Sequence, residues 1–401
     1  MRVLILSWEY PPIVAGGLAR HVSKLSEALV RAGVDVRVLT RGTGDGPSTE
    51  TTAGVVVHRV REDAMPLDLD AFVAWVEAMN SHMHAAGRRL GKRLTFDLVH
   101  GHDWLVAGAA AAIAERLRVP YLTTIHATEY GRHQGWVDEH PQSYIHGIET
   151  WMAGRADRVI TCSHYMRGHV ADVFAIDEAR VAVIPNGIDC GDLRPTGDLV
   201  ALRARFAMPD ERLILLVGRL VYEKGFQLAL EAMPQVIRRS GRVRFLVAGS
   251  GTHEAELKAQ ARRLGLDRHG TFMGWIGDDV LHSLYRIADL CVVPSIYEPF
   301  GLVALEAMAS DCPCIVADTG GLREVVPSSD VGLRFRSRDP RALATMMRRV
   351  LDDAALRERL VAEASVHVLR FDWTDVARRT AAIYEELGAA GAAASARAPS
   401  A

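Results

Sequence analysis

Two pairs of charged residues in the second half of the sequence have types and spacing that could hold a polar or anionic ligand. Glu298 and Glu306 enclose the turn and apolar segment "EPFGLVALE". Arg219 and Lys224 lie in "GRLVYEKG", directly after the apolar run "LILLV". Two cations in one loop suit a diphosphate, whose oxygens accept charge-assisted hydrogen bonds. The structural alternatives are a glutamate placed at a helix start and solvated loop cations.

Glycine pairs mark two further loops. Gly16 and Gly17 precede a helical pattern, where backbone N–H groups can approach an anion. This loop does not match the G-x-G-x-x-G pattern of dinucleotide sites. Gly249 and Gly251 come closer to that pattern, but Glu254 occupies the position that needs a small residue for close packing. The sequence therefore argues against a nicotinamide cofactor.

Histidines and an aspartate follow two predicted strands of the first half. His100 and Asp103 lie in "HGHDWL", and His126 lies in "TTIHATEY". A histidine and a nearby aspartate can bind a metal, but no third and fourth ligands have convincing spacing. We therefore expect no metal site. Asp103 has a second interpretation, as the N-cap of a helix that begins at Trp104.

Two polar stretches of the first half have structural interpretations. Asp68 and Asp70 form a D-x-D triplet that resembles metal-nucleotide motifs, but they precede a helical pattern, so helix capping explains them better. Residues 88–93, "RRLGKR", end a helix that also carries Trp75 and Met83. A contact with a membrane surface is one interpretation. A solvated basic helix end, favoured by the helix dipole, is the preferred one.

The elements that position these residues alternate along the whole chain. Short apolar runs such as "RVLILSW", "RLILLVG" and "LCVVPS" alternate with helical patterns such as "LARHVSKLSEALVRAG". This order predicts an α/β fold with two doubly wound parallel sheets. Residues 187–197 are rich in Pro, Gly and Asp and mark the boundary. We expect domains at 1–190 and 191–371, a helix at 372–388 that returns to the first domain, and a disordered tail at 389–401.

Composition narrows the class of protein. The chain has 401 residues, a formal net charge of −2 and 49% hydrophobic residues, so no overall charge attracts it to nucleic acid. Its five cysteines are scattered, mostly in apolar runs, and we expect buried thiols in a reducing compartment. The sequence shows neither a secretory leader nor a long apolar span. These features predict a cytoplasmic protein without a transmembrane segment.

Taken together, "GRLVYEKG", "PNGID", the Gly-Gly loop, "GHDW" and "TIH" resemble one known family. They are similar to the retaining, two-domain (GT-B type) glycosyltransferases, a family that includes sucrose synthases, bacterial mannosyltransferases and relatives of glycogen synthase. Glu298 and Glu306 match its E-x7-E signature. The resemblance extends from Val3 to about Gly388 and implies two Rossmann-like domains that face each other across a cleft.

Within that family the chain is most similar to actinobacterial enzymes that extend α-1,4-glucans, through "SWEYPP", "GGL" and "HDW". It departs from their pattern at two positions. Val14 stands where those synthases usually have a lysine, and Glu306 is retained where they often lose the second glutamate. The resemblance implies transfer of a hexose, preferably glucose from ADP-glucose or UDP-glucose, to a glucan with an α-linkage. The nucleotide base and the acceptor stay open.

The resemblance also implies roles for individual residues. It places Glu306 at the ribose hydroxyls, Glu298 at the hydroxyls of the transferred sugar, His126 against that sugar and Asp103 near the acceptor. Arg219 and Lys224, with the helix N-terminus at Gly301, would stabilise the leaving diphosphate without a metal or other cofactor. The full set expected at the donor is Gly16, Gly17, Arg219, Lys224, Glu298, Phe300, Gly301, Leu302, Val303 and Glu306.

Three alternatives to glucan elongation are open at this point. An α-mannosyltransferase or another hexosyltransferase with a lipid or small-molecule acceptor would use the same residues. A nucleotide-sugar epimerase also binds a diphosphate between two such domains, but it would isomerise the donor and form no glycosidic bond. A sugar-binding module without activity would not need the complete set of donor residues. No paired carboxylates suit a double displacement, so we expect attack on the same face of the sugar as the leaving phosphate.

Overall fold

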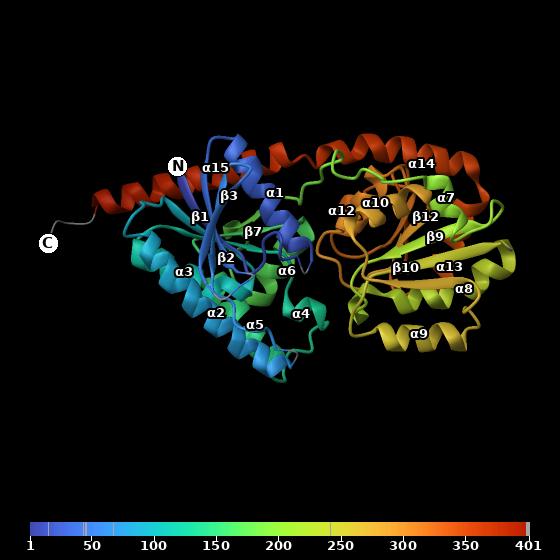
Figure 1. Ribbon diagram of the computed structural model, residues 1–401, viewed down its shortest axis with the longest axis horizontal. Coiled ribbons are helices and arrows are strands. Elements are labelled where there is room, and N and C mark those ends of the chain that lie inside the picture. The colour runs from blue at the N-terminus through green and yellow to red at the C-terminus, as the bar shows by residue number, and fades with distance from the viewer. Residues whose placement is uncertain (15, 43, 45, 67, 241, 398–401) are drawn as a thin grey trace. The chain divides into compact units, whose positions relative to one another are not determined.

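The computed structural model describes residues 1–397 except 15, 43, 45, 67 and 241, and it divides into two compact units. Unit 1 comprises Met1–Gly187 and Trp373–Ala401, and unit 2 comprises Ile188–Asp372. Each unit contains one predominantly parallel sheet with helices packed on it (Figure 1). The predicted α/β class is confirmed, and each sheet restarts the alternation of strand and helix that the sequence shows.

Unit 1 contains an eight-stranded sheet in the order β3-β4-β2-β1-β5-β6-β7-β8. All its pairs are parallel except β3 with β4. The strands are β1 (Arg2–Leu6), β2 (Asp35–Arg41), β3 (Ser48–Thr52), β4 (Val55–Val60), β5 (Leu98–His102), β6 (Tyr121–Ile125), β7 (Arg158–Thr161) and β8 (Val181–Val183). Its helices are α1 (Gly17–Arg31), α2 (Leu69–Leu90), α3 (Ala107–Leu117), α4 (Glu129–Arg132), α5 (Gln142–Arg155), α6 (His164–Phe174) and α15 (Trp373–Arg397), with short 3-10 turns η1 (Trp104–Val106) and η2 (Glu178–Arg180).

The last helix belongs to unit 1. Figure 1 shows α15, in red, beside α1, in blue, and the two helices pack against each other. Its residues Val376, Ala377 and Ile383 are buried in the same core as strands β1 and β2. The expected disordered tail is corrected in part, because α15 continues past Gly388 to Arg397. Alanine has the highest helix propensity, so an Ala-rich segment can extend an existing helix without packing; residues 398–401 lie outside the described residues.

Unit 2 contains a six-stranded parallel sheet in the order β11-β10-β9-β12-β13-β14. The strands are β9 (Arg212–Val217), β10 (Val243–Ala248), β11 (Gly270–Gly274), β12 (Leu290–Val293), β13 (Cys314–Ala317) and β14 (Leu333–Phe335). The helices are α7 (Leu199–Ala204), α8 (Phe226–Ser240), α9 (Glu254–Arg263), α10 (Asp278–Ile287), α11 (Leu302–Ala309), α12 (Leu322–Val325), α13 (Pro340–Asp352) and α14 (Ala354–His367), with 3-10 turns η3 (Tyr222–Lys224) and η4 (Val368–Arg370).

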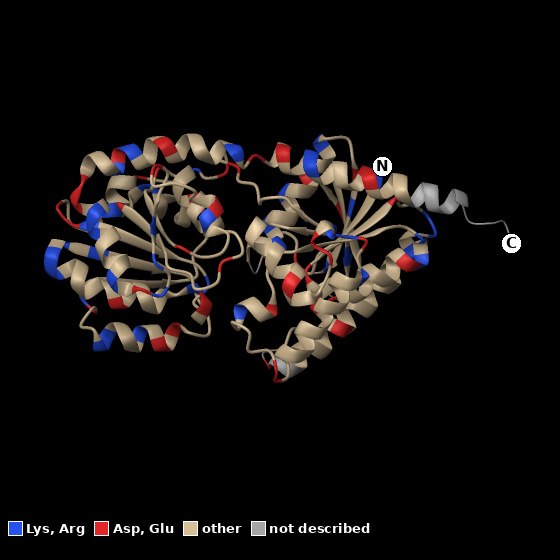
Figure 2. Cartoon of the chain, turned by 180° about the vertical axis from the view of Figure 1, so that it is seen from behind, with Lys and Arg blue, Asp and Glu red and all other residues tan. Residues whose placement is uncertain are grey.

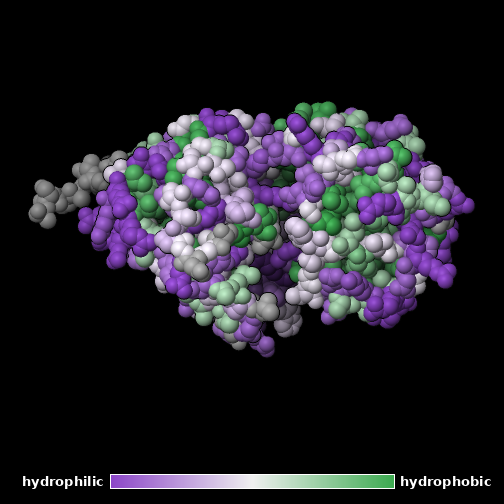
Figure 3. Space-filling view, viewed as in Figure 1, coloured by the Kyte–Doolittle hydropathy of each residue, from purple (hydrophilic) through white to green (hydrophobic). Residues whose placement is uncertain are grey.

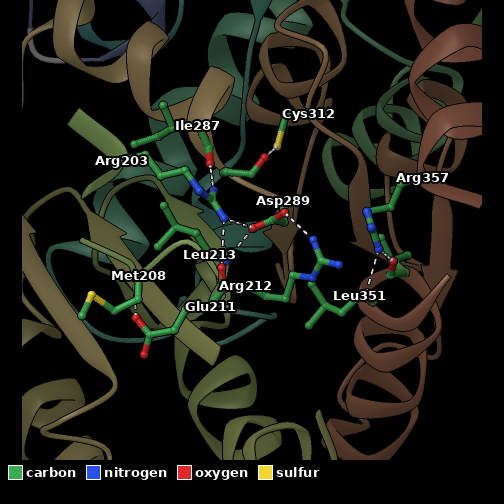
Figure 4. A network of polar contacts seen from close by, with 12 residues as sticks. Arg203, Met208, Glu211, Arg212, Leu213, Ile287, Asp289, Cys312, Leu351 and Arg357 are labelled. Carbon is green, nitrogen blue, oxygen red and sulfur yellow. Dashed lines mark hydrogen bonds and ion pairs between the residues drawn. The ribbon is translucent and has the colours of Figure 1, made fainter. Parts of the chain in front are cut away.

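An ion-pair network fastens the amino-terminal edge of the sheet in unit 2. Asp289, just before β12, accepts hydrogen bonds from Arg203 Nη2 at 2.8 Å and from Arg212 Nη1 at 3.2 Å (Figure 4). It also accepts from the backbone N of Leu213 at 2.8 Å. Because Arg203 comes from α7 and Arg212 begins β9, this network ties the first helix of the unit to the sheet. It occupies the edge opposite the loops in which ligands of parallel sheets bind.

The surface is polar and of mixed charge. Lys and Arg residues are interspersed with Asp and Glu residues on both units (Figure 2), and the formal net charge is −2. Hydrophilic residues are spread over the visible face of each unit, with smaller apolar patches among them (Figure 3). Trp75 and Met83 are buried, which argues against a membrane contact through α2. Among the described residues, no helix has the length and apolar character needed to cross a bilayer.

Candidate functional site

In unit 2 the loops after β9 and β12 approach each other closely at the carboxyl edge of the sheet. Gly225 has φ +71°, and a Cβ there would lie 2.0 Å from the carbonyl oxygen of Pro294, so only glycine fits. The carbonyl oxygen of Glu223 accepts a hydrogen bond from the backbone N of Ile296 at 2.8 Å. These contacts hold the loop that carries Lys224 against the loop that carries Glu298.

Lys224 and Glu298 form an ion pair in this edge. Lys224 Nζ lies 2.8 Å from Glu298 Oε2, and the two side chains are 23% and 11% exposed. Ser295 Oγ donates to the same oxygen at 2.9 Å. The sequence assigned the lysine to phosphate and the glutamate to sugar as separate groups, whereas the structure joins them. A half-buried ammonium beside a carboxylate can hold an anion on one side and sugar hydroxyls on the other.

Arg219 is the more exposed cation of this loop. Its Nη2 atom lies 3.8 Å from Glu223 Oε1, and its side chain is 56% exposed. The guanidinium therefore offers donors at the surface of the loop. Arg219, Lys224 and Glu298 lie on loops that touch each other, so the structure brings three of the predicted residues together within one unit.

Glu306 lies on the first turns of α11, where Tyr285 of α10 donates its hydroxyl to Glu306 Oε2 at 2.9 Å. Tyr285 is completely buried. A fixed acceptor of this kind suits a pair of vicinal hydroxyls, because a carboxylate has two oxygens. Sequence analysis missed Tyr285, because "SLYRIAD" reads as an ordinary helix that ends before a strand.

The N-terminus of α11 has no side-chain cap. Gly301 is its N-cap residue, with φ +118° and no side-chain hydrogen bond to the first turn. The backbone N–H groups of Leu302 and Val303 therefore occupy the position at which a helix favours an anion. Phe300 is 4% exposed and its ring packs edge-to-face against Phe371 at 5.9 Å. Its side chain is part of the core, so a donor would contact only its backbone.

In unit 1 a buried aspartate fixes the loop that carries His126. Asp103 Oδ1 accepts a hydrogen bond from the backbone N of His126 at 2.8 Å. Asp103 has φ +60° and makes no capping bond to η1, so the capping interpretation is wrong. Burial raises the pKa of Asp103 to about 6, although Arg132 and the backbone donors lower it. The carboxylate accepts hydrogen bonds from two backbone N–H groups of the loop that carries His126. It makes none to the start of η1.

His126 lies at the end of β6 and pairs with a second histidine. Its Nε2 lies 3.1 Å from His102 Nδ1. Burial, helped by the nearby Arg132, lowers the pKa of His126 to about 4. The ring is therefore neutral at pH 7 and can exchange hydrogen bonds with sugar hydroxyls without carrying charge.

Behind this loop lies an acidic cluster that sequence analysis missed. Glu149 of α5 accepts two hydrogen bonds from the backbone N of Glu129, at 3.0 and 2.9 Å. Burial raises the pKa of Glu149 to about 8, although Arg132 lowers it. Arg132 Nη1 lies 3.5 Å from Glu129 Oε2. Glu149 lies in the middle of α5, and nothing in the local sequence pattern distinguishes it from a surface glutamate.

His100 is saturated by hydrogen bonds. Its Nε2 contacts Thr124 Oγ1 at 2.7 Å and its Nδ1 contacts the hydroxyl of Tyr384 at 2.8 Å. The pair of His100 and Asp103 considered from the sequence therefore offers no ligand nitrogen on the histidine. His102 lies two residues further along β5, on the same face of the strand, and its ring is tilted by 33° to that of His100 with the ring centroids 4.3 Å apart.

The Gly-Gly loop leads directly into α1. Gly16 is the N-cap residue, with extended φ −167° and no side-chain capping bond, and Gly17 is the first residue of the helix. A Cβ at Gly16 would meet nothing within 4 Å, so open space lies beside the loop. The first turn of α1 is therefore available to an anion, as the sequence predicts. His21 follows on the same helix and is buried.

The comparisons with known proteins agree with one another across both units. Residues 15–192 match the family described as Glycosyltransferase Family 4, and residues 202–367 match Glycosyl transferases group 1. A glycogen synthase from Mycobacterium tuberculosis is 42% identical over 96% of this chain and 94% of that protein. A D-inositol 3-phosphate glycosyltransferase from Segniliparus rotundus is 34% identical over 99% of this chain and 92% of that protein.

A solved structure extends this likeness to the whole fold. Sucrose-phosphate synthase from Thermosynechococcus elongatus matches with a TM-score of 0.83 and 26% identity, over 97% of this chain and 99% of that chain. The match covers both sheets, and the loops that hold the charged residues follow strands of the shared fold.

Proposed function

The chain belongs to the group 1 glycosyltransferases, and we propose that it moves a hexose from a nucleoside diphosphate sugar to a carbohydrate acceptor with retention of the α-configuration. One observation carries the donor half of this proposal. Lys224, Glu298 and Ser295 form one hydrogen-bonded group on loops that touch each other, next to the uncapped start of α11. The cation and the helix dipole would then bind the phosphates of the donor, and the carboxylate would bind its sugar.

In the proposed reaction the bond between the anomeric carbon and the phosphate oxygen breaks, and the acceptor oxygen bonds to that carbon on the same face. The leaving diphosphate takes the proton of the acceptor hydroxyl, so no catalytic base is needed. Arg219, Lys224 and the N–H groups of α11 stabilise the negative charge of the leaving group. Neutral His126 contacts the sugar, Asp103 holds the loop behind it, and Glu306 binds the ribose. No metal or other cofactor takes part.

The preferred reaction is elongation of an α-1,4-glucan with glucose from an ADP or UDP donor. The support is the 42% identity to a glycogen synthase over nearly the whole chain. A second candidate is transfer to a small phosphorylated acceptor, which the likeness to D-inositol 3-phosphate glycosyltransferases favours. The two candidates would use the same proposed donor residues and differ in the acceptor.

A donor and acceptor screen tests this proposal. Purified protein is incubated with ADP-, UDP- and GDP-sugars and with glucans or small phosphorylated acceptors, and both nucleoside diphosphate release and the glycosidic product are measured. We expect one donor to dominate and Glu298→Gln to lose most of the activity. Glu254→Gln is the matched control, because Glu254 forms an ion pair with Lys258 at 2.7 Å in α9 of the same unit. An isomerised donor without a glycosidic product would identify an epimerase instead.

A further inference from the structure

Three histidines from three different elements of unit 1 converge on one point. His21 comes from α1, His102 ends β5, and His126 follows β6. One ring nitrogen of each lies within 4.8 Å of the others, and His21 and His102 are buried while His126 is partly exposed. We propose that His21, His102 and His126 form a binding site for a divalent cation of the zinc type, with each ring supplying one nitrogen.

Two nitrogens of this cluster lack the partners that buried polar atoms normally have. His21 Nδ1 and His102 Nε2 are buried and have no hydrogen-bond partner among the described residues. The neighbouring His100 differs, since Thr124 and Tyr384 occupy both of its nitrogens. A buried nitrogen without a partner costs free energy, so each exception in a folded protein calls for an explanation such as an ion or a water. A cation bound at His21 Nδ1 would provide a partner for that atom, whereas His102 faces His126 through its other nitrogen, Nδ1.

The rings are in the protonation state that a metal needs. Burial lowers the pKa of all three histidines, and the neighbouring histidine charges lower the values of His21 and His102 further. Neutral imidazole is the commonest metal ligand in proteins. Asn186 lines the same small cavity as His21, and its Oδ1 also lacks a hydrogen-bond partner among the described residues. An amide oxygen beside the ring can accept the N–H of a ligating imidazole, and such a contact orients the ring and raises metal affinity.

The geometry and the donor types select the class of cation. Zinc binds imidazole nitrogen at about 2.0–2.1 Å in a tetrahedron, so the nitrogens of one site lie about 3.4 Å apart. The pair of His102 Nδ1 and His126 Nε2 is 3.1 Å apart, close to that value. The nitrogen of His21 lies within 4.8 Å of the other two, so the ring would have to move closer when a metal binds. Three nitrogens and no carboxylate favour zinc over magnesium or calcium and leave one coordination position open.

This site would act as an inhibitor switch, a consequence that rests on the proposed function. His126 is the residue proposed to contact the transferred sugar, and an Nε2 atom of this ring that is held by a metal can no longer bond to a sugar hydroxyl. Metal binding itself is measured without donor or acceptor. A failure of the metal site is therefore distinguishable from a failure of the proposed activity.

The test uses the full chain, freed of metal with a chelator and then dialysed. Zn²⁺ is titrated by calorimetry, and Co²⁺ is titrated as a coloured stand-in whose visible absorption reports tetrahedral coordination. We expect one strong site per chain that is lost in His102→Gln and in His21→Gln. Asn186→Ala keeps all three ligands and should weaken binding by about 10–100-fold. His133→Gln is the control, because His133 is an exposed histidine paired with Glu129, and it should bind as the native chain does.

X-ray absorption at the zinc edge of the loaded native chain provides a readout that does not depend on the folding of any variant. Three nitrogen neighbours at about 2.0–2.1 Å, together with loss of the site in folded variants, would support the proposal. Strong binding that persists in both histidine variants, a coordination shell dominated by oxygen or sulfur, or the absence of a strong site would overturn it.

Discussion

The residues proposed to bind the donor in unit 2 and those proposed to contact the sugar in unit 1 stabilise their polar groups in different ways. In unit 2 the groups are charged and paired, as in the contact of Lys224 with Glu298 at 2.8 Å. In unit 1 His126 is neutral, and burial shifts the pKa values of His126 and Asp103 toward their uncharged forms. Charge is concentrated where we propose that a diphosphate departs, whereas neutral hydrogen-bonding groups lie where we expect sugar hydroxyls.

This difference predicts opposite sensitivities. The function of a partly exposed ion pair should change little with pH. It should depend strongly on each charged partner, because the loss of one leaves the other uncompensated. A buried neutral cluster tolerates conservative substitutions but resists protonation, because burial opposes charge. Substitutions and changes of pH should therefore affect the residues of unit 1 and of unit 2 differently.

The largest effect is expected for the cations of unit 2. Lys224→Ala removes the ammonium between phosphate and sugar and also leaves Glu298 without this partner, so we expect kcat to fall about 100-fold or more. Arg219→Ala should cost somewhat less, because its side chain is 56% exposed. Turnover is measured as nucleoside diphosphate release at saturating donor. Lys258→Ala in α9 is the matched control, and near-native turnover in both site variants would remove the diphosphate role.

The sequence identified the charged residues of unit 2 more completely than the geometry around them. Glu298, Glu306, Arg219 and Lys224 can be predicted as donor residues because each pair is close together along the chain. The contact between Lys224 and Glu298 joins residues that are far apart in the sequence, and so does the bond from Tyr285 to Glu306. Spacing along one chain does not encode such contacts, and they appear only when neighbouring parallel strands bring their loops together.

Unit 1 shows where local patterns mislead. Asp103 follows a strand and precedes a helical turn, which is the pattern of a cap, but a positive φ and the N–H of His126 turn the carboxylate elsewhere. The sequence gives no signal for strand β3, because its residues, "STETT", are all polar and exposed. Its antiparallel pairing with β4, and not an apolar face, holds it in the sheet. Strand β14 was missed because three residues give no period.

We expect acid to destabilise unit 1. Burial lowers the pKa of His21, His102 and His126, and an unfolded histidine titrates near about 6.5. Below that pH the unfolded chain binds more protons than the folded chain, so the free energy of unfolding falls as pH is lowered. At pH 5 each ring costs up to about 2 kcal/mol. Above about 6.5 all forms are neutral and this contribution vanishes.

The acids of unit 1 act in the opposite direction. The raised pKa values of Asp103 and Glu149 keep these groups protonated in the folded state at a pH where the unfolded chain has lost the proton. Their contribution therefore stabilises unit 1 as pH falls. We expect it to be smaller than the loss of unfolding free energy that the histidines cause. Hydrogen exchange read by mass spectrometry should show unit 1 opening before unit 2 at pH 5. Equal protection of both units at pH 5 and pH 7 would contradict this.

A smaller effect is expected for Tyr285→Phe. The substitution removes only the hydroxyl that donates to Glu306, and a hydrogen bond of this kind contributes about 1 kcal/mol or slightly more when its acceptor is charged. We expect the donor KM to rise several-fold, with kcat and the acceptor KM nearly unchanged. If Tyr285 acts through Glu306, the double variant with Glu306→Gln should lose no more than Glu306→Gln alone. Independent, additive losses would show that the tyrosine supports the core and not the carboxylate.

The smallest expected effect, no loss at all, belongs to removal of divalent ions. In unit 2, we propose that Arg219, Lys224 and the start of α11 provide the positive charge and N–H donors that the leaving diphosphate needs, so we expect no step there that requires a metal. In unit 1, a cation on His21, His102 and His126 would compete with the sugar for His126. Excess EDTA should therefore leave turnover unchanged, and after added Zn²⁺ it should restore turnover. The measurement is nucleoside diphosphate release before and after chelation, with Mg²⁺ added back in parallel. Turnover that disappears with EDTA and returns with Mg²⁺ would mean that a metal shares the diphosphate charge, and the contrast between a charged donor half and a neutral sugar-facing half would then need revision.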